Sequence, residues 1–401
     1  MTLLAYNSKY VIASATPSTT TNSALQDDPQ ASQVFTLGAT QIVLAIYAAN
    51  GAPGATQPAT GIQNAISVDA SDKALSYDSA GASGRPVRNC TFWIGSLAAG
   101  EHTIKGRFAS MTNGSTATIS NRVLLIYIFD GDEFQYVDDA TSQGTSSASF
   151  VDDSYASKTF TPSAACVLLA LYNVTNSGAT ESNTGKVAAI SIAGSDYGQA
   201  EKSPGASNYA DSVFTVHCLS RTAVSTVVKG RFASSYSGTI TVARRQLGVL
   251  LIEAAVAFDI VTSTTQFTTT SQSLVDDTQA SISRTPAAAS ELLVIAMGTK
   301  RKNVNFALQS GQRYGIKVDA NDRANSCGAP CNGGASWAQS MATAWGESVT
   351  AAAHTVKGRV SNNEIYATAC IDARQVVALW LVLHIALPTL TTGAATGLGL
   401  D

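Results

Sequence analysis

The sequence predicts an all-β fold of three tandem jelly-roll domains, each of them a two-sheet β-sandwich. A set of landmarks recurs at intervals of about 125 residues, which is the size of a whole domain rather than of a solenoid repeat. Apolar runs of strand length lie between turns that are rich in Gly, Ser, Asn and Pro. No stretch of the sequence carries a helical stripe of adequate length.

Four landmarks keep the same order in every repeat. Each repeat has a pair of adjacent aspartates, a segment that ends in Asp, the tripeptide Lys-Gly-Arg, and an arginine that precedes an apolar run. The aspartate pairs begin at Asp27, Asp152 and Asp276, and the second landmark ends at Asp72, Asp196 and Asp322. The tripeptides begin at Lys105, Lys229 and Lys357, and the arginines are Arg122, Arg245 and Arg374. The shared order indicates one domain written three times.

The repeats also predict the domain limits. We expect jelly-roll domains at residues 1–129, 130–254 and 255–388, followed by a C-terminal tail at residues 389–401. A domain of this length can bury a core without the help of a metal or a disulfide. Each repeat contains about eight short strand-like segments, which favours a jelly roll over an immunoglobulin-like sandwich.

Two apolar runs in each repeat are expected to form core strands. The first run occupies residues 42–49, 167–172 and 292–297, and the second occupies residues 123–129, 247–252 and 376–387. Even the longest is shorter than the roughly 20 residues of a membrane helix. Because the runs have strand length and are bounded by turn residues, we expect strands that are buried on both faces.

The Lys-Gly-Arg tripeptide is expected in a strand with one inner and one outer face. Side chains alternate along a strand, so Gly106 faces inward with its apolar neighbours while Lys105 and Arg107 point outward. The same pattern recurs at Lys229 and Arg231, and at Lys357 and Arg359. A glycine at the middle of the strand allows a facing side chain to come close.

Composition argues against several classes of protein. Only 13% of the residues are charged and the net charge is −3, which gives no footprint for nonspecific nucleic-acid binding. The N-terminus lacks a basic segment followed by a sustained apolar one, so we expect no secretory signal and synthesis in a cytoplasm. The six cysteines fall mostly at non-equivalent places, unlike a repeated disulfide framework, although Cys327 and Cys331 could close a local loop.

The histidines do not form a repeated catalytic site. His102 and His354 are equivalent, but the second repeat has no histidine at that point. His217 and His384 lie in apolar, strand-like surroundings, where a structural histidine is the usual finding. We therefore expect no enzymatic activity and no cofactor.

The repeated aspartates raise the alternative of a calcium site. Carboxylate oxygens suit calcium, but neighbouring aspartates in turns more often bond their own backbone. The second repeat has Ala193 where the others have Asp69 and Asp319, which argues against a repeated metal site. We expect no metal.

The second half of each repeat resembles a known family. The stretch from His102 through GRFAS to NRVLLIYI resembles the closing half of compact jelly-roll domains in tailed-phage structural proteins of the head decoration or cement type. Those domains are similar in plan to trimeric tumour-necrosis-factor and complement-type jelly rolls, in which three chains surround a threefold axis. The resemblance implies a single-chain pseudo-trimer, since the short connection after Phe129 keeps the domains close. A linear string of domains is the alternative.

The resemblance implies a noncatalytic virion protein, made in the host cytoplasm, that decorates or cements the head shell. Its partners would then be the major capsid protein or other virion proteins, with no specific nucleic acid and no membrane. The alternative function is a receptor- or glycan-binding component of a tail or fibre. Only 7% of the residues are aromatic, which offers a poor platform for sugars.

The charged landmarks are the candidate docking or inter-domain surface. They comprise Lys105, Arg107, Lys229, Arg231, Lys357, Arg359, Arg122, Arg245 and Arg374. Arginine offers a planar fork for carboxylates, and lysine a point charge on a long stem. The sequence leaves open whether these side chains dock on a partner, are solvated, or pair with the repeated aspartates across domain boundaries.

Overall fold

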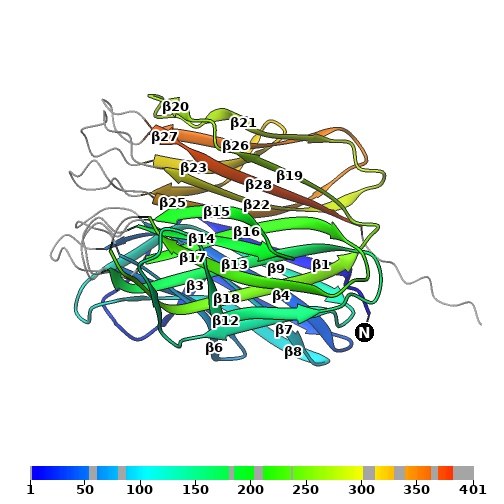
Figure 1. The fold of residues 1–401 in the computed structure, drawn as a ribbon, viewed down its shortest axis with the longest axis horizontal. Helices are drawn as coiled ribbons and strands as arrows, with labels where there is room; N and C mark the ends of the chain where they lie inside the picture. The colour runs from blue at the N-terminus through cyan, green and yellow to red at the C-terminus, as the bar shows by residue number, and fades with distance from the viewer. Residues whose placement is uncertain are drawn as a thin grey trace, which may run out of the picture.

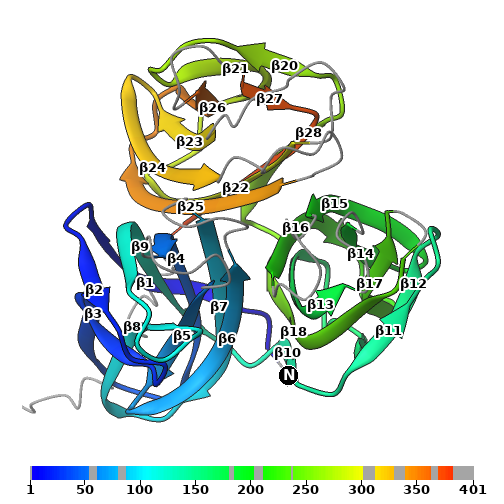
Figure 2. The ribbon, with the colours of Figure 1, turned by 90° about the vertical axis from the view of Figure 1, so that its left-hand side faces the viewer.

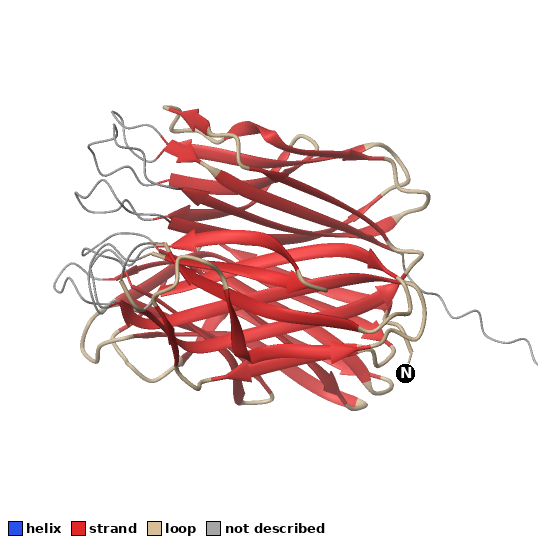
Figure 3. Ribbon diagram, viewed as in Figure 1, coloured by secondary structure: helices blue, strands red, loops and turns tan. Residues whose placement is uncertain are grey.

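The computed structural model is built of β-strands (Figure 3), and these fall into three groups along the chain. It describes residues 2–53, 61–79, 87–179, 185–202, 211–235, 238–300, 312–328, 339–362 and 369–382. Among these residues no helix is long and apolar enough to cross a membrane. The expected C-terminal tail at residues 389–401, His384 and Cys331 lie outside the described residues.

The strands of each group have the following bounds (Figure 1). Domain 1 comprises β1 (Ala5–Ser14), β2 (Ser18–Thr20), β3 (Gln26–Leu37), β4 (Gln41–Pro53), β5 (Gly61–Val68), β6 (Ser71–Ser79), β7 (Val87–Leu97), β8 (Gly100–Ser110) and β9 (Ala117–Asp130). Domain 2 comprises β10 (Phe134–Asp139), β11 (Gln143–Thr145), β12 (Val151–Phe160), β13 (Cys166–Ala179), β14 (Lys186–Ile192), β15 (Ser195–Lys202), β16 (Asp211–Arg221), β17 (Thr226–Ser234) and β18 (Ile240–Glu253). Domain 3 comprises β19 (Ala257–Ser263), β20 (Phe267–Thr269), β21 (Val275–Arg284), β22 (Ser290–Lys300), β23 (Gln312–Val318), β24 (Asn321–Gly328), β25 (Gln339–Val349), β26 (His354–Asn362), β27 (Ala369–Ile371) and β28 (Ala373–Leu381).

Each domain is a jelly roll of two antiparallel sheets. In domain 1 the inner sheet has the order β1-β9-β4-β7, and the outer sheet has the order β3-β8-β5-β6. Domain 2 repeats this with β10-β18-β13-β16 and β12-β17-β14-β15, and domain 3 with β19-β28-β22-β25 and β21-β26-β23-β24. The chain crosses repeatedly between the two sheets, as in a jelly roll. The predicted fold class is confirmed.

The three domains surround a common axis (Figure 2). Strands β7, β16 and β25 contact one another at the centre of the triangle. Phe92 of domain 1 meets Phe214 of domain 2 edge-on, with ring centroids 6.0 Å apart. The Tyr127 hydroxyl of domain 1 donates to the Leu292 carbonyl of domain 3 at 2.9 Å. All three pairs of domains are therefore in contact, which confirms the pseudo-trimer and excludes a linear string.

The first apolar run is buried on both faces because each face meets a different core. In β4, Val43, Ala45 and Tyr47 lie in the core between the two sheets of domain 1. The alternating residues Leu44 and Ile46 lie in a second cluster, which also contains residues of domains 2 and 3. Strand alternation thus divides one apolar run between a domain core and the centre of the triangle. The prediction of doubly buried strands is confirmed, except that the last run is buried only as far as Leu381: Val382 is exposed, and residues 383–387 lie outside the described residues.

The glycine of the tripeptide makes room for a tyrosine. A Cβ on Gly106 would lie 2.4 Å from the ring of Tyr47, and one on Gly230 would lie 2.3 Å from the ring of Tyr172. The hydroxyl of Tyr47 donates to Asp28 at 2.8 Å, so the ring cannot withdraw without losing that bond. In domain 3 the tyrosine near the glycine comes instead from β23, where Tyr314 lies against the equivalent position.

Substituting Gly106 with valine is expected to destabilise domain 1. The new side chain would overlap the Tyr47 ring, and overpacking of this kind costs about 1–3 kcal/mol of unfolding free energy. Urea denaturation would measure the change. Gly38→Ala is the control, because a Cβ on Gly38 meets no atom within 4 Å and should leave the midpoint nearly unchanged. An unchanged midpoint for Gly106→Val would contradict this account of the tripeptide.

Candidate docking and interdomain sites

The outer sheet of domain 1 carries a network of four charged side chains. The Lys105 ammonium lies 2.6 Å from Asp27, and Arg107 Nε lies 3.0 Å from the same carboxylate. Arg107 Nη1 lies 2.6 Å from Asp72. The register explains the network, because Asp27 and Arg107 pair directly and Arg107 crosses the small Ala65 of β5 to reach β6. Three landmarks of the sequence are thus one cluster.

The same network occurs in the other two domains. Lys229 and Arg231 bind Asp152 at 2.5 and 3.0 Å, and Lys357 and Arg359 bind Asp276 at 2.7 and 3.1 Å. Arg231 also binds Asp196, and Arg359 binds Asp322. The residue paired with the arginine on the neighbouring strand (β5, β14 or β23) is small in every domain: Ala65, Ala189 and Gly315. Of the alternatives that the sequence left open, these side chains pair with the repeated aspartates, but within one domain rather than across a domain boundary.

The second aspartate of each pair points into the core and binds the fourth landmark. In β3 the pairing register shifts between Asp27 and Ser32, and Asp28 is fully buried there. Arg122 Nε lies 2.8 Å from Asp28, and both side chains are 0% exposed. Arg245 and Asp153, and Arg374 and Asp277, form equivalent buried pairs at 3.0 and 2.8 Å. These three arginines lie inside their domains, so they are not exposed for docking on a partner.

The equivalent histidines bind the aspartates that were considered as calcium ligands. His102 Nδ1 lies 2.7 Å from Asp69, whose other oxygen accepts from the Thr103 amide at 2.9 Å. His102 Nε2 lies 2.8 Å from the Ala98 carbonyl, so both ring nitrogens face oxygen acceptors. The hydrogen bond to Asp69 raises the pKa of His102. His354 contacts Asp319 in the same way. Within the described ranges no group of three potential metal ligands is found.

Domains 1 and 2 share a buried charge cluster. Lys202 Nζ of β15 lies 2.5 Å from Asp78 of β6, and the Asp78 side chain is 0% exposed. Lys186 Nζ lies 2.9 Å from Asp211, and this pair is also buried. Burial raises the pKa of Asp78 to about 6, against the opposing effect of Lys202. Asp78 and Lys202 occupy the same register position in the equivalent strands β6 and β15. The two domains thus place opposite charges at one position, and these charges pair where the strands meet.

We use the term seam for the contact region between two domains. The last long strand of one domain faces a strand of the preceding domain in the triangle: β18 faces β6 at the 1–2 seam, and β28 faces β16 at the 2–3 seam. Gln246 of domain 2 reaches domain 1 at the 1–2 seam, and Gln375 of domain 3 reaches domain 2 at the 2–3 seam. Val123 is their register equivalent at the 3–1 seam.

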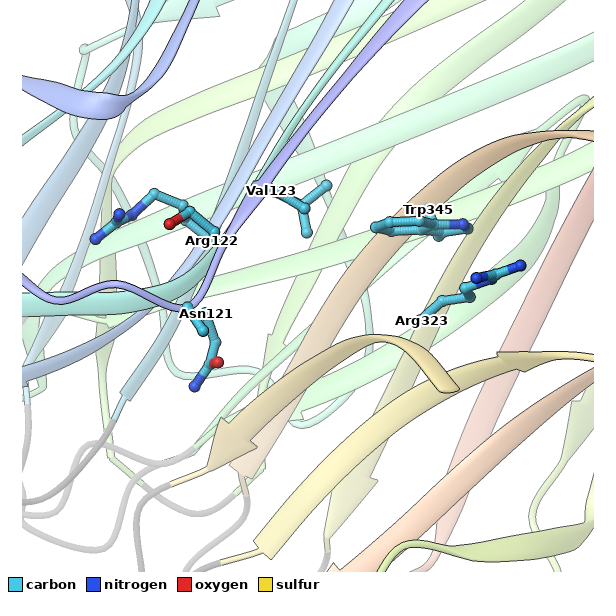
Figure 4. A pocket seen from close by; sticks show the side chains of 8 residues that line it. Asn121, Arg122, Val123, Arg323 and Trp345 are labelled. Carbon is cyan, nitrogen blue, oxygen red and sulfur yellow. The ribbon is translucent and has the colours of Figure 1, made fainter. Parts of the chain in front are cut away.

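The 3–1 seam contains an open pocket of about 200 Å³ (Figure 4). Arg323 stacks on Trp345, with its guanidinium carbon 5.9 Å from the ring centroid. Val123 and Asn121 of domain 1 line the opposite side (Figure 4). Arg323 also lies 2.6 Å from Glu347, so its charge is paired within domain 3.

Sequence reasoning missed the seam residues. Asp78, Lys202 and Gln375 belong to none of the four landmarks. Asp78 and Lys202 are opposite in charge at one register position, whereas the equivalent of Gln375 in domain 2 is also a glutamine, Gln246. The available signal was the opposite charge of the side chains at positions 78 and 202, which occupy the same register position in their domains. His217, which the sequence predicts to be a structural histidine, lines a seam pocket opposite Gln375.

Comparisons with known proteins give distant likenesses of fold. The protein described under the triple jelly roll fold and turret assembly of an archaeal virus is 11% identical, with a TM-score of 0.20, over 88% of this chain and 82% of that one. PNGF-II is 10% identical, with a TM-score of 0.28, over 82% and 99%. The protein of T=1 particles derived from infectious bursal virus is 7% identical, with a TM-score of 0.22, over 94% and 79%. No protein-family model and no curated protein matches the sequence.

Proposed function

We propose that this protein is a noncatalytic structural component of a virion, which decorates or cements the head shell. The observation that carries the proposal is the arrangement of three equivalent outer sheets around one axis in a single chain. Such a molecule can meet three neighbouring shell subunits at once, while its unlike domains free it from strict symmetry. It would be made in the host cytoplasm and would reside in the virion.

The Lys-Gly-Arg strands are the proposed docking surface. The side chains of Lys105, Lys229 and Lys357 are 36%, 35% and 32% exposed, although each binds an aspartate. An ammonium has three donors, so each lysine can bind a further carboxylate without leaving its aspartate. The proposed partner surface is therefore acidic, as on the major capsid protein or another virion protein.

Immunogold labelling of virus particles tests the location. Antibodies against this protein should label the head shell over its whole surface in negative stain. Label confined to the tail would favour the receptor- or glycan-binding alternative. Particles that carry no label at either place would overturn a virion role.

A triple substitution tests the docking surface separately from the fold. Lys105→Gln, Lys229→Gln and Lys357→Gln remove the exposed ammonium groups but leave the arginine–aspartate pairs in place. We expect a melting temperature close to that of the wild type, because each exposed ion pair contributes only about 0–1 kcal/mol. We also expect at least a tenfold loss of binding to heads that lack the protein, measured by cosedimentation. Undiminished binding would contradict docking through these strands.

A further inference from the structure

The 2–3 seam contains a cavity between domains 2 and 3. Its volume is about 380 Å³, and it is lined by β15 and β16 of domain 2 and by β19, β22 and β28 of domain 3. Tyr197 stacks on His217 at its wall, with ring centroids 4.1 Å apart and an interplanar angle of 18°. Met297 and Gln375 lie on the domain 3 side. The volume falls within the range of about 300–1,000 Å³ that is usual for small-molecule sites.

Gln375 is buried at the wall of this cavity with an unused acceptor. The side chain is 1% exposed, and its Nε2 lies 3.1 Å from Nδ1 of His217. Its Oε1 has no hydrogen-bond partner among the described residues. A buried acceptor without a donor is costly, so this oxygen indicates a group that the protein itself does not supply.

The equivalent glutamine at the 1–2 seam is fully satisfied. Gln246 Oε1 accepts from Thr91 and from Asn173, each at 3.1 Å, and its Nε2 donates to the Leu75 carbonyl at 2.9 Å. Neither donor is available to Gln375. Met297 replaces Asn173 in the register, and Thr215, the equivalent of Thr91, donates to the Gly198 carbonyl instead.

Smaller side chains leave the 2–3 seam open. At the 1–2 seam, Arg244 bonds to Asp138 at 2.7 Å and reaches the Lys73 carbonyl of domain 1. Their register equivalents at the 2–3 seam are Ala373 and Thr262, which line the cavity. The same fold thus places an ion pair at one seam and a partly polar cavity at the other.

The lining favours an uncharged ligand that carries hydroxyl groups. Asp196 is paired with Arg231, and Arg374 with Asp277, so the charged groups at the wall are already neutralised. Burial lowers the pKa of His217 to about 4, so its ring is neutral at pH 7. With Nδ1 accepting from Gln375, its Nε2–H is a donor, and Gln375 Oε1 is an acceptor. A hydroxyl group of a ligand can accept from His217 or donate to Gln375. The C–H groups of the same ligand can pack on Met297 and on the aromatic wall.

We propose that the 2–3 cavity binds a neutral pyranose sugar, with one hydroxyl on His217 Nε2 and another on Gln375 Oε1, which has no accessible surface in this structure and turns toward the cavity when the sugar binds. The hydroxyls of Thr262, Ser263 and Thr264 line the cavity and offer further partners. The cavity is more than ten times the roughly 30 Å³ share of one water, so a single bridging water does not fill it. This inference is independent of the virion proposal, since a seam site can serve a free protein or an assembled one.

Saturation-transfer difference NMR on the full chain tests the site. The probes are D-glucose, D-galactose, D-mannose and N-acetyl-D-glucosamine at millimolar concentration. We expect ring-proton signals from at least one sugar with the wild type, and about tenfold weaker binding with Gln375→Met, which keeps the side-chain size but removes the amide. No signal from any of the four sugars with the wild type would overturn the proposal.

A matched pair of arginine substitutions locates the binding. Thr264→Arg places a long side chain at the 2–3 cavity, and Ala15→Arg places one at the register-equivalent exposed position beside the 3–1 pocket. We expect loss of the sugar signals with Thr264→Arg and retention with Ala15→Arg, at equal melting temperatures. Signals that survive Thr264→Arg, or that vanish equally in both variants, would show that the sugar binds elsewhere.

Discussion

Arg245→Met is expected to lower the unfolding free energy of domain 2 by about 3–5 kcal/mol, because it leaves a buried carboxylate without its cation. Arg245 Nε lies 3.0 Å from Asp153, and both side chains are 0% exposed. The same carboxylate accepts from the Tyr172 hydroxyl at 2.8 Å, which alone cannot neutralise it. Urea denaturation followed by intrinsic fluorescence and circular dichroism would measure the loss.

Arg231→Met is the control within the same domain. Arg231 binds Asp152, the neighbour of Asp153 in the sequence, but its side chain is 23% exposed and that of Asp152 is 48% exposed. We expect a loss of about 0–1 kcal/mol. Equal losses for the two variants would show that the inward and outward aspartates of each pair do not differ as described.

Lys202→Met is expected to have the second large effect, because it leaves Asp78 buried between domains 1 and 2. Lys202 Nζ lies 2.5 Å from Asp78, and the remaining lysine of the cluster, Lys186, is held by Asp211 at 2.9 Å. We expect a loss of about 3–5 kcal/mol at pH 7. The double variant Asp78→Leu with Lys202→Met removes both charges and should recover most of that stability.

The cost of Lys202→Met should depend on pH. Burial raises the pKa of Asp78 to about 6, so the folded state binds the Asp78 proton more tightly than the unfolded state does. Removing Lys202 raises that pKa further, since an attractive positive charge is lost. The variant should therefore gain stability relative to the wild type as the pH falls from 7 to 5. A loss that is the same at both pH values would indicate that Asp78 stays ionised.

Much of the domain fold could be predicted from the sequence, because its signals are local and repeated three times. The alternation around Gly106 gave the inner and outer faces of β8, and the adjacent aspartates at 27 and 28 divide between those faces. The aspartates and the tripeptide keep the same spacing in every repeat because their side chains form one ion-pair network across strands β3, β8 and β6.

The seams could not be predicted in the same way. Which residues meet between domains depends on the rotation of one jelly roll against the next, and no sequence period encodes that rotation. Asp78 and Lys202 are 124 positions apart and meet only because their strands approach each other across the 1–2 seam. Likewise, the tyrosine that packs against the tripeptide glycine is Tyr47 of the inner sheet in domain 1 but Tyr314 of the outer sheet in domain 3. This difference follows from packing in three dimensions.

The most direct test of the virion proposal is the number of copies in purified particles. Quantitative mass spectrometry of intact virions, and of heads separated from tails, would count this chain against the major capsid protein. The account predicts a fixed ratio that stays with the heads, at tens to hundreds of copies per particle. A few copies that leave with the tails, or none in purified virions, would contradict it.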